Sequence, residues 1–233
     1  MDPKVCVVVG AGPGNGAAIA ARFAAAGYRV ALCARDEQRL AALARKIDGA
    51  AAYPYDARDP AAAPRVFAEI RAGLGRPTVL VYNAGAGAFA NVDDTTVEAL
   101  QAAWEVNARG LLLAARAVLP DLRAAGGGSI VVIGATASLR GGASFAPFAS
   151  AKAAQRSLAQ SMARHLGPEK IHVAYVILDG VVHLEATRRQ MADRPDEFFL
   201  EPADIAESVF FLTQQRSQAW TFELDLRPFG ERW

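Results

Sequence analysis

The chain has 233 residues, of which 52% are hydrophobic and 21% are charged, and its formal net charge is +1. This composition is typical of one globular domain and excludes a disordered chain. The small net charge gives no electrostatic reason to expect binding to nucleic acid or to a membrane surface, and no apolar stretch is long enough to span a bilayer. The first predicted strand begins at residue 5, which leaves no room for a signal peptide, so the sequence predicts a cytoplasmic protein.

Predicted strands and helices alternate along the chain. The expected strands lie at residues 5–9, 29–33, 51–55, 78–82, 129–133, 171–178 and 220–226. The expected helices lie at about 16–26, 36–46, 60–72, 96–124, 147–166 and 202–213. This alternation predicts an α/β protein, in which a parallel sheet carries helices on both faces as a three-layer αβα sandwich. Cys6 and Cys33 fall inside predicted strands as buried thiols, and no cluster of His and Cys predicts a metal site.

The first strand leads into a turn that holds four glycines. The turn comprises Gly10, Gly12, Pro13, Gly14, Asn15 and Gly16. Glycine lets the backbone turn sharply and lets another molecule approach it closely, and the next helix offers unpaired N–H groups and the positive end of its dipole. Such a turn suits a pyrophosphate. Asn15 stands where the common G-x-G-x-x-G pattern has its last glycine, and a tight turn without a ligand is the alternative interpretation.

Residues that follow the second and third strands indicate which dinucleotide the turn would bind, because ligands of such sheets lie beyond the carboxyl ends of the strands. Ala34 supplies no carboxylate for the ribose hydroxyls of NAD, whereas Arg35 can pair with the 2′-phosphate of NADP. Asp56, followed by Ala57, would accept a hydrogen bond from the adenine amino group. The alternatives are a solvated arginine at position 35 and an ordinary helix cap at position 56. The sequence therefore favours NADP over NAD.

Further motifs extend this pattern over nearly the whole chain, which resembles the short-chain dehydrogenase/reductase family. They are the glycine turn, Asp56, Asn83-Ala84-Gly85, Val106-Asn107-Ala108-Arg109-Gly110, Gly128-Ser129-Ile130 and Ser150-Ala151-Lys152-Ala153-Ala154. The resemblance implies one NAD(P)-binding, Rossmann-like domain over residues 1–233, with a doubly wound, mainly parallel seven-stranded sheet. It also implies a small-molecule substrate and a homotetramer or homodimer, with the helices at 96–124 and 147–166 at the subunit interface.

The resemblance assigns roles to individual residues. Its further cofactor contacts would include Asn83, Ala84, Gly85, Gly180 and Val182. Asn107 would hold a water molecule that connects to Lys152, which binds the nicotinamide ribose. The alternative for Asn107 is a buried asparagine bonded to local backbone.

The chain departs from the family at the catalytic centre, which consists of Ser, Tyr and Lys with the Tyr four residues before the Lys. Lys152 is present, but Phe148 occupies the tyrosine position and Ala135 the serine position. Thr136 is one residue out of register, and a distorted loop would bring it to the substrate. Phenylalanine has no proton to give and alanine cannot hydrogen-bond a carbonyl, so reduction of an ordinary ketone should be slower by roughly 10²- to 10⁴-fold.

Other groups could replace the missing acid. Lys152 could donate a proton itself, because burial lowers a lysine pKa. His183 begins the predicted substrate lid at residues 183–200, and histidine titrates near neutrality; the alternative is an ordinary loop histidine. Asp179, which stands where the family has proline, could also act there, and a turn residue before Gly180 is its alternative.

Three hypotheses about function follow. The first is an NADP(H)-dependent oxidoreductase with an altered proton donor, acting on a substrate such as an iminium ion or an activated double bond. The second is a cofactor-binding protein without redox turnover, which acts as a sensor or as the partner subunit of a reductase. The third is a non-redox enzyme, such as an isomerase or a lyase, on the same scaffold. Fold alone does not choose between them.

Overall fold

The computed structural model describes residues 4–231, so residues 1–3 and 232–233 of the predicted domain lie outside the described residues. Seven strands form one parallel sheet in the order β3-β2-β1-β4-β5-β6-β9. Its strands are β1 (Val5–Val9), β2 (Arg29–Ala34), β3 (Ala50–Pro54), β4 (Pro77–Tyr82), β5 (Gly128–Ile133), β6 (Ile171–Leu178) and β9 (Glu223–Leu226). The longer helices are α1 (Asn15–Ala25), α2 (Glu37–Ala44), α3 (Ala62–Leu74), α4 (Val97–Trp104), α5 (Gly110–Ala124), α6 (Ala146–Leu166) and α8 (Pro202–Gln214).

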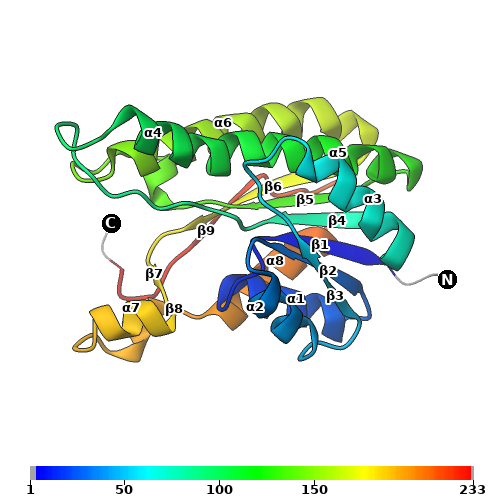
Figure 1. Cartoon of the computed structure of the whole chain (residues 1–233), viewed down its shortest axis with the longest axis horizontal. Helices are drawn as coiled ribbons and strands as arrows, with labels where there is room; N and C mark the ends of the chain where they lie inside the picture. The colour runs from blue at the N-terminus through cyan, green and yellow to red at the C-terminus, as the bar shows by residue number, and fades with distance from the viewer. Residues whose placement is uncertain (1–3, 232–233) are drawn as a thin grey trace.

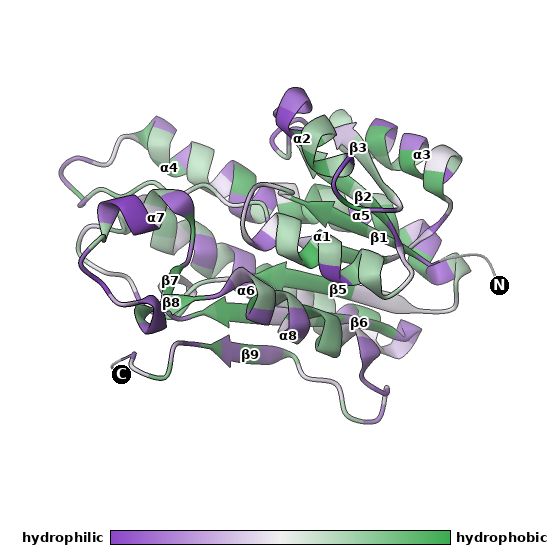
Figure 2. Cartoon of the chain, turned by 90° about the horizontal axis from the view of Figure 1, so that it is seen from below, coloured by the Kyte–Doolittle hydropathy of each residue, from purple (hydrophilic) through white to green (hydrophobic). Residues whose placement is uncertain are grey.

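The sheet lies between two layers of helices, as predicted. Figure 1 shows α3, α5 and α6 above the sheet and α1, α2 and α8 below it. The central strands are rich in β-branched residues and are buried on both faces, which is the pattern of a covered parallel sheet. In Figure 2 these strands are coloured as hydrophobic, while polar residues gather on the outer helix faces. One apolar cluster fills each side of the sheet, so the predicted αβα sandwich is confirmed.

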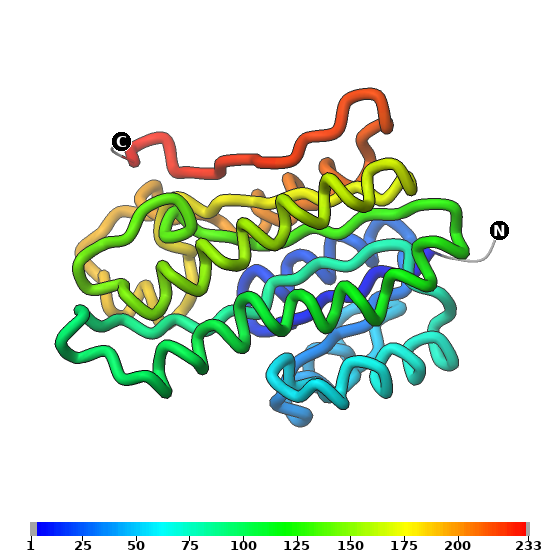
Figure 3. Tube along the Cα trace, turned by 90° about the horizontal axis from the view of Figure 1, so that it is seen from above, coloured from blue at the N-terminus to red at the C-terminus, as the bar shows by residue number. Residues whose placement is uncertain are grey.

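The strand order reverses beside β1, where β2 lies on one side and β4 on the other. Ligands of doubly wound sheets bind at such a reversal, beyond the carboxyl ends of the strands. The last strand, β9, lies at the opposite edge beside β6, and the two ends of the chain lie at opposite ends of the molecule (Figure 3). β9 therefore carries Arg227 to the same carboxyl-terminal side as the loops after β5 and β6.

The prediction of one continuous helix at 96–124 is wrong, because the helix is interrupted. A π-helical turn at Glu105–Arg109 separates α4 from α5. The Tyr82 hydroxyl donates a hydrogen bond to the Val106 carbonyl oxygen within this turn, and a Cβ on Gly110 would collide with the same hydroxyl. A side chain inserted into the helical hydrogen-bond ladder is a recognised cause of such irregularities, and π turns occur often at functional sites.

The segment after β6 also differs from its prediction. Two short parallel strands, β7 (Val181–Val182) and β8 (Phe199–Leu200), form a second sheet. Helix α7 (Glu185–Gln190) lies between them in the chain. The last strand of the main sheet begins at Glu223 rather than at residue 220. Periodicity could not identify β7 and β8, because two-residue strands carry no pattern of their own.

Cys6 and Cys33 are both free and buried, as the sequence predicted. Within residues 4–231, no helix combines the length and the apolar character that crossing a membrane requires.

Candidate functional site

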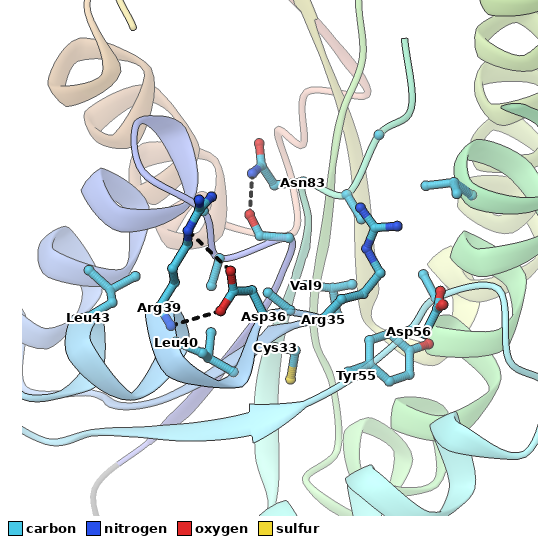
Figure 4. A pocket seen from close by; sticks show the side chains of 18 of the residues that line it. Val9, Cys33, Arg35, Asp36, Arg39, Leu40, Leu43, Tyr55, Asp56 and Asn83 are labelled. Atoms are coloured by element: carbon cyan, nitrogen blue, oxygen red, sulfur yellow. Dashed lines mark hydrogen bonds and ion pairs between the residues drawn. The ribbon is translucent and has the colours of Figure 1, made fainter. Parts of the chain in front are cut away.

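A pocket of about 880 Å³ lies over the carboxyl ends of β1, β2 and β4 (Figure 4). The predicted cofactor residues that line it are Gly10, Gly12, Pro13, Arg35, Asp56, Ala57, Asn83, Ala84 and Gly85. Gly14, Asn15 and Gly16 belong to the same turn but do not line the pocket. Lys152, Gly180 and Val182 do not line it either. The pocket therefore brings part of the glycine turn together with the predicted cofactor residues that follow β2, β3 and β4, and the remaining predicted residues lie outside it.

The glycine turn is held tightly against its neighbours. Gly10 has a φ of +89°, and a Cβ there would lie 2.5 Å from the Ala84 backbone nitrogen. A Cβ on Gly16 would collide with the Gly10 carbonyl oxygen. The Asn83 amide donates a hydrogen bond of 2.8 Å to that same oxygen, so Asn83 fixes the turn from the β4 loop. Only glycine fits at these two positions.

Three arginines surround the outer end of the pocket. Arg39 pairs with Asp36, the cap of α2, at 3.1 Å. Arg58 pairs with Asp56 at 2.8 Å, and this hydrogen bonding holds the pKa of Asp56 below its usual value. Arg35 extends into the same space as Asn83 and Asp56 in Figure 4. Within residues 4–231 it forms no hydrogen bond or ion pair, so its guanidinium is available to an anionic ligand.

The predicted role of Asp56 toward adenine is not tested by this arrangement. Both carboxylate oxygens accept hydrogen bonds from Arg58, and Oδ1 also accepts one from the Arg58 backbone N–H. Asp56 therefore shapes the rim of the pocket through Arg58.

Lys152 lies on α6 and is buried. Its Nζ donates hydrogen bonds to the Ile133 carbonyl oxygen at 2.9 Å and to Gln155 Oε1 at 3.0 Å. Burial lowers the pKa of Lys152 to about 7, because the low-dielectric surroundings disfavour the charged form.

Asn107 lies on the π turn and is fully buried. Its Nδ2 donates to the carbonyl oxygens of Ala86 and Ala103, at 3.1 and 2.9 Å, which is the local backbone bonding named as the alternative. Its Oδ1 is buried and has no partner among the described residues. A Cβ on Gly85 would contact both this oxygen and Lys152 Nζ, so the two polar atoms meet beside the pocket-lining Gly85.

Gln155 is a residue that the sequence analysis did not identify. It is fully buried on α6, one turn after Lys152. Its Oε1 accepts from Lys152, and its Nε2 donates to the Asn107 carbonyl oxygen at 2.9 Å. Gln155 thus links the two residues directly. A long polar side chain on the buried face of an alanine-rich helix was the signal available in the sequence.

Phe148 lies one helical turn before Lys152, and its ring centroid is 6.0 Å from Lys152 Nζ. The spacing prediction that both side chains share one face of a helix is therefore confirmed. The Phe148 ring meets the Phe89 ring at 5.5 Å, and Phe89 meets Phe145 at 5.1 Å. An aromatic cluster, formed by Phe89, Phe145 and Phe148, occupies the position where a phenol was expected.

The loop after β5 offers no hydroxyl in place of the missing serine. Ala135 is extended, and the Ser138 hydroxyl donates back to the Ala135 carbonyl oxygen at 2.7 Å. The Thr136 hydroxyl is 2.6 Å from Asp179 Oδ1 and 3.3 Å from the Leu178 carbonyl oxygen. The Thr136 hydroxyl is thus bound to the β6 loop, and its contact with a substrate stays a prediction. Asp179 is also occupied by this contact and by Arg227 at 3.4 Å.

His183 is bound into the β7–β8 pair. Its backbone N–H donates to the Leu200 carbonyl oxygen at 2.8 Å, and its Nδ1 contacts Glu201. Its ring packs against Phe199 at 5.5 Å. These contacts match the alternative of a loop histidine and give no support to His183 as a proton donor.

The predicted lid touches the glycine turn. Phe199 and Leu200 are buried, and β7 pairs with β8 through Val181 and Val182. A Cβ on Gly14 would collide with the Leu184 side chain, so the start of the segment lies against the end of the glycine turn.

A sequence profile described as short chain dehydrogenase matches residues 4–195. The chain belongs to this family. An uncharacterized oxidoreductase of Staphylococcus saprophyticus is 30% identical over 233 residues, covering 98% of each chain. An inactive 2-(S)-hydroxypropyl-CoM dehydrogenase of Xanthobacter autotrophicus is 34% identical over 207 residues, covering 82% of this chain and 90% of that one. A metagenomic short-chain oxidoreductase solved in complex with NADP is 30% identical, with a TM-score of 0.84 and 98% of both chains covered.

These likenesses confirm the predicted family and the Rossmann-like α/β fold. They identify the chain as a short-chain oxidoreductase of the NAD(P)-dependent class.

Proposed function

We propose that this protein is an NADP(H)-dependent oxidoreductase that acts on a small molecule and has lost the tyrosine and serine of its family. The observation that carries the proposal is the Arg35 guanidinium, which faces the pocket and has no hydrogen bond or ion pair within residues 4–231, while Ala34 offers no carboxylate to a ribose. The NADP complex of the metagenomic relative supports this choice. Lys152, which is kept, would bind the nicotinamide ribose.

The residues present fit such a cofactor. The glycines at positions 10 and 16 leave no room for a Cβ, which suits a turn that approaches a pyrophosphate closely. Two buried amide oxygens, Asn15 Oδ1 and Asn107 Oδ1, have no partner among the described residues, and buried polar atoms are rarely left unpaired. The bound cofactor would supply the hydride, and the protein's own residues would bind and orient it.

Calorimetric titration with NADPH and NADH tests the proposal. We expect tighter binding of NADPH, and Arg35→Ala should weaken NADPH binding about tenfold while leaving NADH binding unchanged. Arg45→Ala, which removes an exposed cation at the opposite end of α2 and outside the pocket, is the control. Equal affinities for the two dinucleotides, or an unaltered NADPH affinity in Arg35→Ala, would contradict the proposal.

A second candidate is a protein that binds the cofactor without redox turnover. The phenylalanine at position 148 and the alanine at position 135 favour it, and a relative at 34% identity carries the name of an inactive dehydrogenase. Measured consumption of NADPH with any acceptor would exclude this candidate.

The expected homodimer or homotetramer is also a proposal. Val97, Leu100 and Trp104 on α4 are 73%, 41% and 46% exposed, and with Ser150 of α6 they line a shallow apolar groove. Exposed apolar patches of this kind often mark protein interfaces. Light scattering should show an oligomer, and Trp104→Glu should shift it toward the monomer; a monomeric wild-type protein at micromolar concentration would overturn the proposal. We further propose a cytoplasmic location, which the two free thiols support.

A further inference from the structure

Two protein acceptors hold the Lys152 amine in place. Its Nζ has two protein acceptors, the Ile133 carbonyl oxygen and Gln155 Oε1. The Gln155 amide in turn donates to the Asn107 carbonyl oxygen. A side-chain amide neither gains nor loses a proton near neutral pH, so the link from Lys152 through Gln155 fixes the lysine in place and ends there.

The nearby hydroxyls are also bound to the protein. Thr136 donates to Asp179, and Ser138 donates to the Ala135 carbonyl oxygen. Tyr175 is fully buried behind Lys152 and Gln155, and burial raises the pKa of its phenol to about 12. Each of these three hydroxyls therefore already donates to a protein acceptor.

The aromatic cluster of Phe89, Phe145 and Phe148 lies at the position of the family's tyrosine. The aromatic cluster joins the loop after β4, which carries Phe89, to the start of α6, which carries Phe145 and Phe148. The Ala146 N–H donates to the Ala90 carbonyl oxygen at 3.1 Å, and this bond holds the two segments together. Phe89 is 66% exposed and Phe145 is 39% exposed, so part of the cluster is open to a ligand. Aromatic faces attract organic cations.

From these observations we infer that the acceptor is a preformed iminium cation, an inference that rests on the proposed NADP(H)-dependent function. The iminium carbon would accept a hydride with its electron pair from the reduced nicotinamide, and the C=N π pair would become the nitrogen lone pair. The iminium is reduced to a tertiary amine and the nicotinamide is oxidised, with no proton taken up or released. A neutral ketone would instead become an alkoxide that needs a proton, and Phe148 and Ala135 stand in place of the two family hydroxyls that would assist this step.

The test compares two bicyclic acceptors of similar size in the presence of NADPH: an N-methyl dihydroisoquinolinium salt, which is permanently charged, and tetralone, which is a neutral ketone. After subtraction of the rate without enzyme, kcat/KM for the iminium should exceed that for tetralone at least about 10²-fold. The rate should be equal in H₂O and D₂O. Deuterium should reach the amine from NADPH deuterated at the transferring carbon and not from D₂O.

Phe89→Leu provides a second measurement, because it removes an exposed ring and keeps an apolar side chain. The KM for the iminium should rise about threefold, while NADPH affinity stays the same. Phe211→Leu, which removes an exposed ring of α8 across the sheet, is the matched control and should leave the KM unchanged.

Two results separate this inference from the function on which it rests. If NADPH binds but the iminium is consumed no faster than tetralone, or if its rate shows a solvent isotope effect, the iminium inference is wrong and the proposed cofactor stands. If NADPH does not bind, the proposed function fails, and the inference fails with it.

Discussion

The pocket over β1, β2 and β4 and the region around Lys152 differ in how much of the family pattern they keep. The pocket retains a glycine turn that Asn83 holds in place, and its Arg35 forms no ion pair within residues 4–231. The region around Lys152 keeps the lysine, which has Phe148 and Gln155 beside it, and Ala135 stands at the serine position of the family. Binding a dinucleotide requires shape and positive charge, whereas transferring a proton requires an acid at one position. Under the proposed function, these two requirements are met separately in one fold.

The largest effect should come from restoring the missing acid. Phe148→Tyr combined with Ala135→Ser places a phenol one helical turn from Lys152, whose Nζ is already 6.0 Å from the ring centroid at position 148. NADPH-dependent reduction of simple ketones, followed by NADPH absorbance, should rise by about 10²-fold or more. Phe145→Tyr, which adds a hydroxyl outside the catalytic register, is the control.

The ketone activity of the double variant can also contradict this prediction. If the double variant binds NADPH normally and still shows no gain over a broad panel of ketones, the tyrosine is not what limits the site. The region around Lys152 would then have been rebuilt for other chemistry.

Burial of Lys152 should lower the free energy of unfolding by an amount that depends on pH. Its folded pKa of about 7 lies below its ordinary value of 10.5. Below pH 7 both the folded and the unfolded chain carry the charge, and the folded chain bears the full cost of burying it. Between pH 7 and pH 10.5 the unfolded chain binds more protons, so the free energy of unfolding rises with pH.

Lys152→Met should therefore be more stable than the wild type. Its gain in the free energy of unfolding should be about 2 kcal/mol larger at pH 6 than at pH 9. Urea denaturation of both proteins at the two pH values measures this difference, in which other titrating groups cancel. Lys46→Met, at an exposed position, is the control and should show no such dependence. Equal differences at both pH values would mean that Lys152 is not buried as a neutral amine.

The sequence was most informative where the backbone itself determines the site. The glycine turn, Arg35 and the spacing of Phe148 from Lys152 were all found from their positions after strands or along a helix, because those positions follow from local periodicity. Asn83 was predicted to contact the cofactor and also fixes Gly10.

The contacts around Lys152 could not be predicted in the same way. Gln155 meets Lys152 one turn away, but its bond to the Asn107 carbonyl depends on how α6 packs against the π turn. The π turn depends on the Tyr82 hydroxyl, which comes from a strand 24 residues earlier. Thr136, Asp179 and His183 were judged as isolated loop residues, and their partners lie on other segments. Tertiary contacts determine the hydrogen-bond partners of such side chains, and no local sequence pattern encodes those contacts.

The smallest of the three effects should come from altering the intact pocket. Ala34 ends β2 beside Arg35 and lines the pocket, so Ala34→Asp would place a carboxylate where the ribose hydroxyls of NAD are bound in doubly wound folds. The new carboxylate would also compete for the Arg35 guanidinium and repel a 2′-phosphate. We expect NADPH affinity to fall about tenfold and NADH affinity to rise, as measured by calorimetry. Ala34→Ser, which adds a small uncharged group, is the control and should change neither affinity strongly. Because Ala34 lines the pocket and neither Phe148 nor Lys152 does, the turnover ratio between iminium and ketone acceptors at saturating cofactor should stay constant. A variant that changed this ratio would show that the two regions are coupled, and the separation between binding and proton transfer would no longer hold.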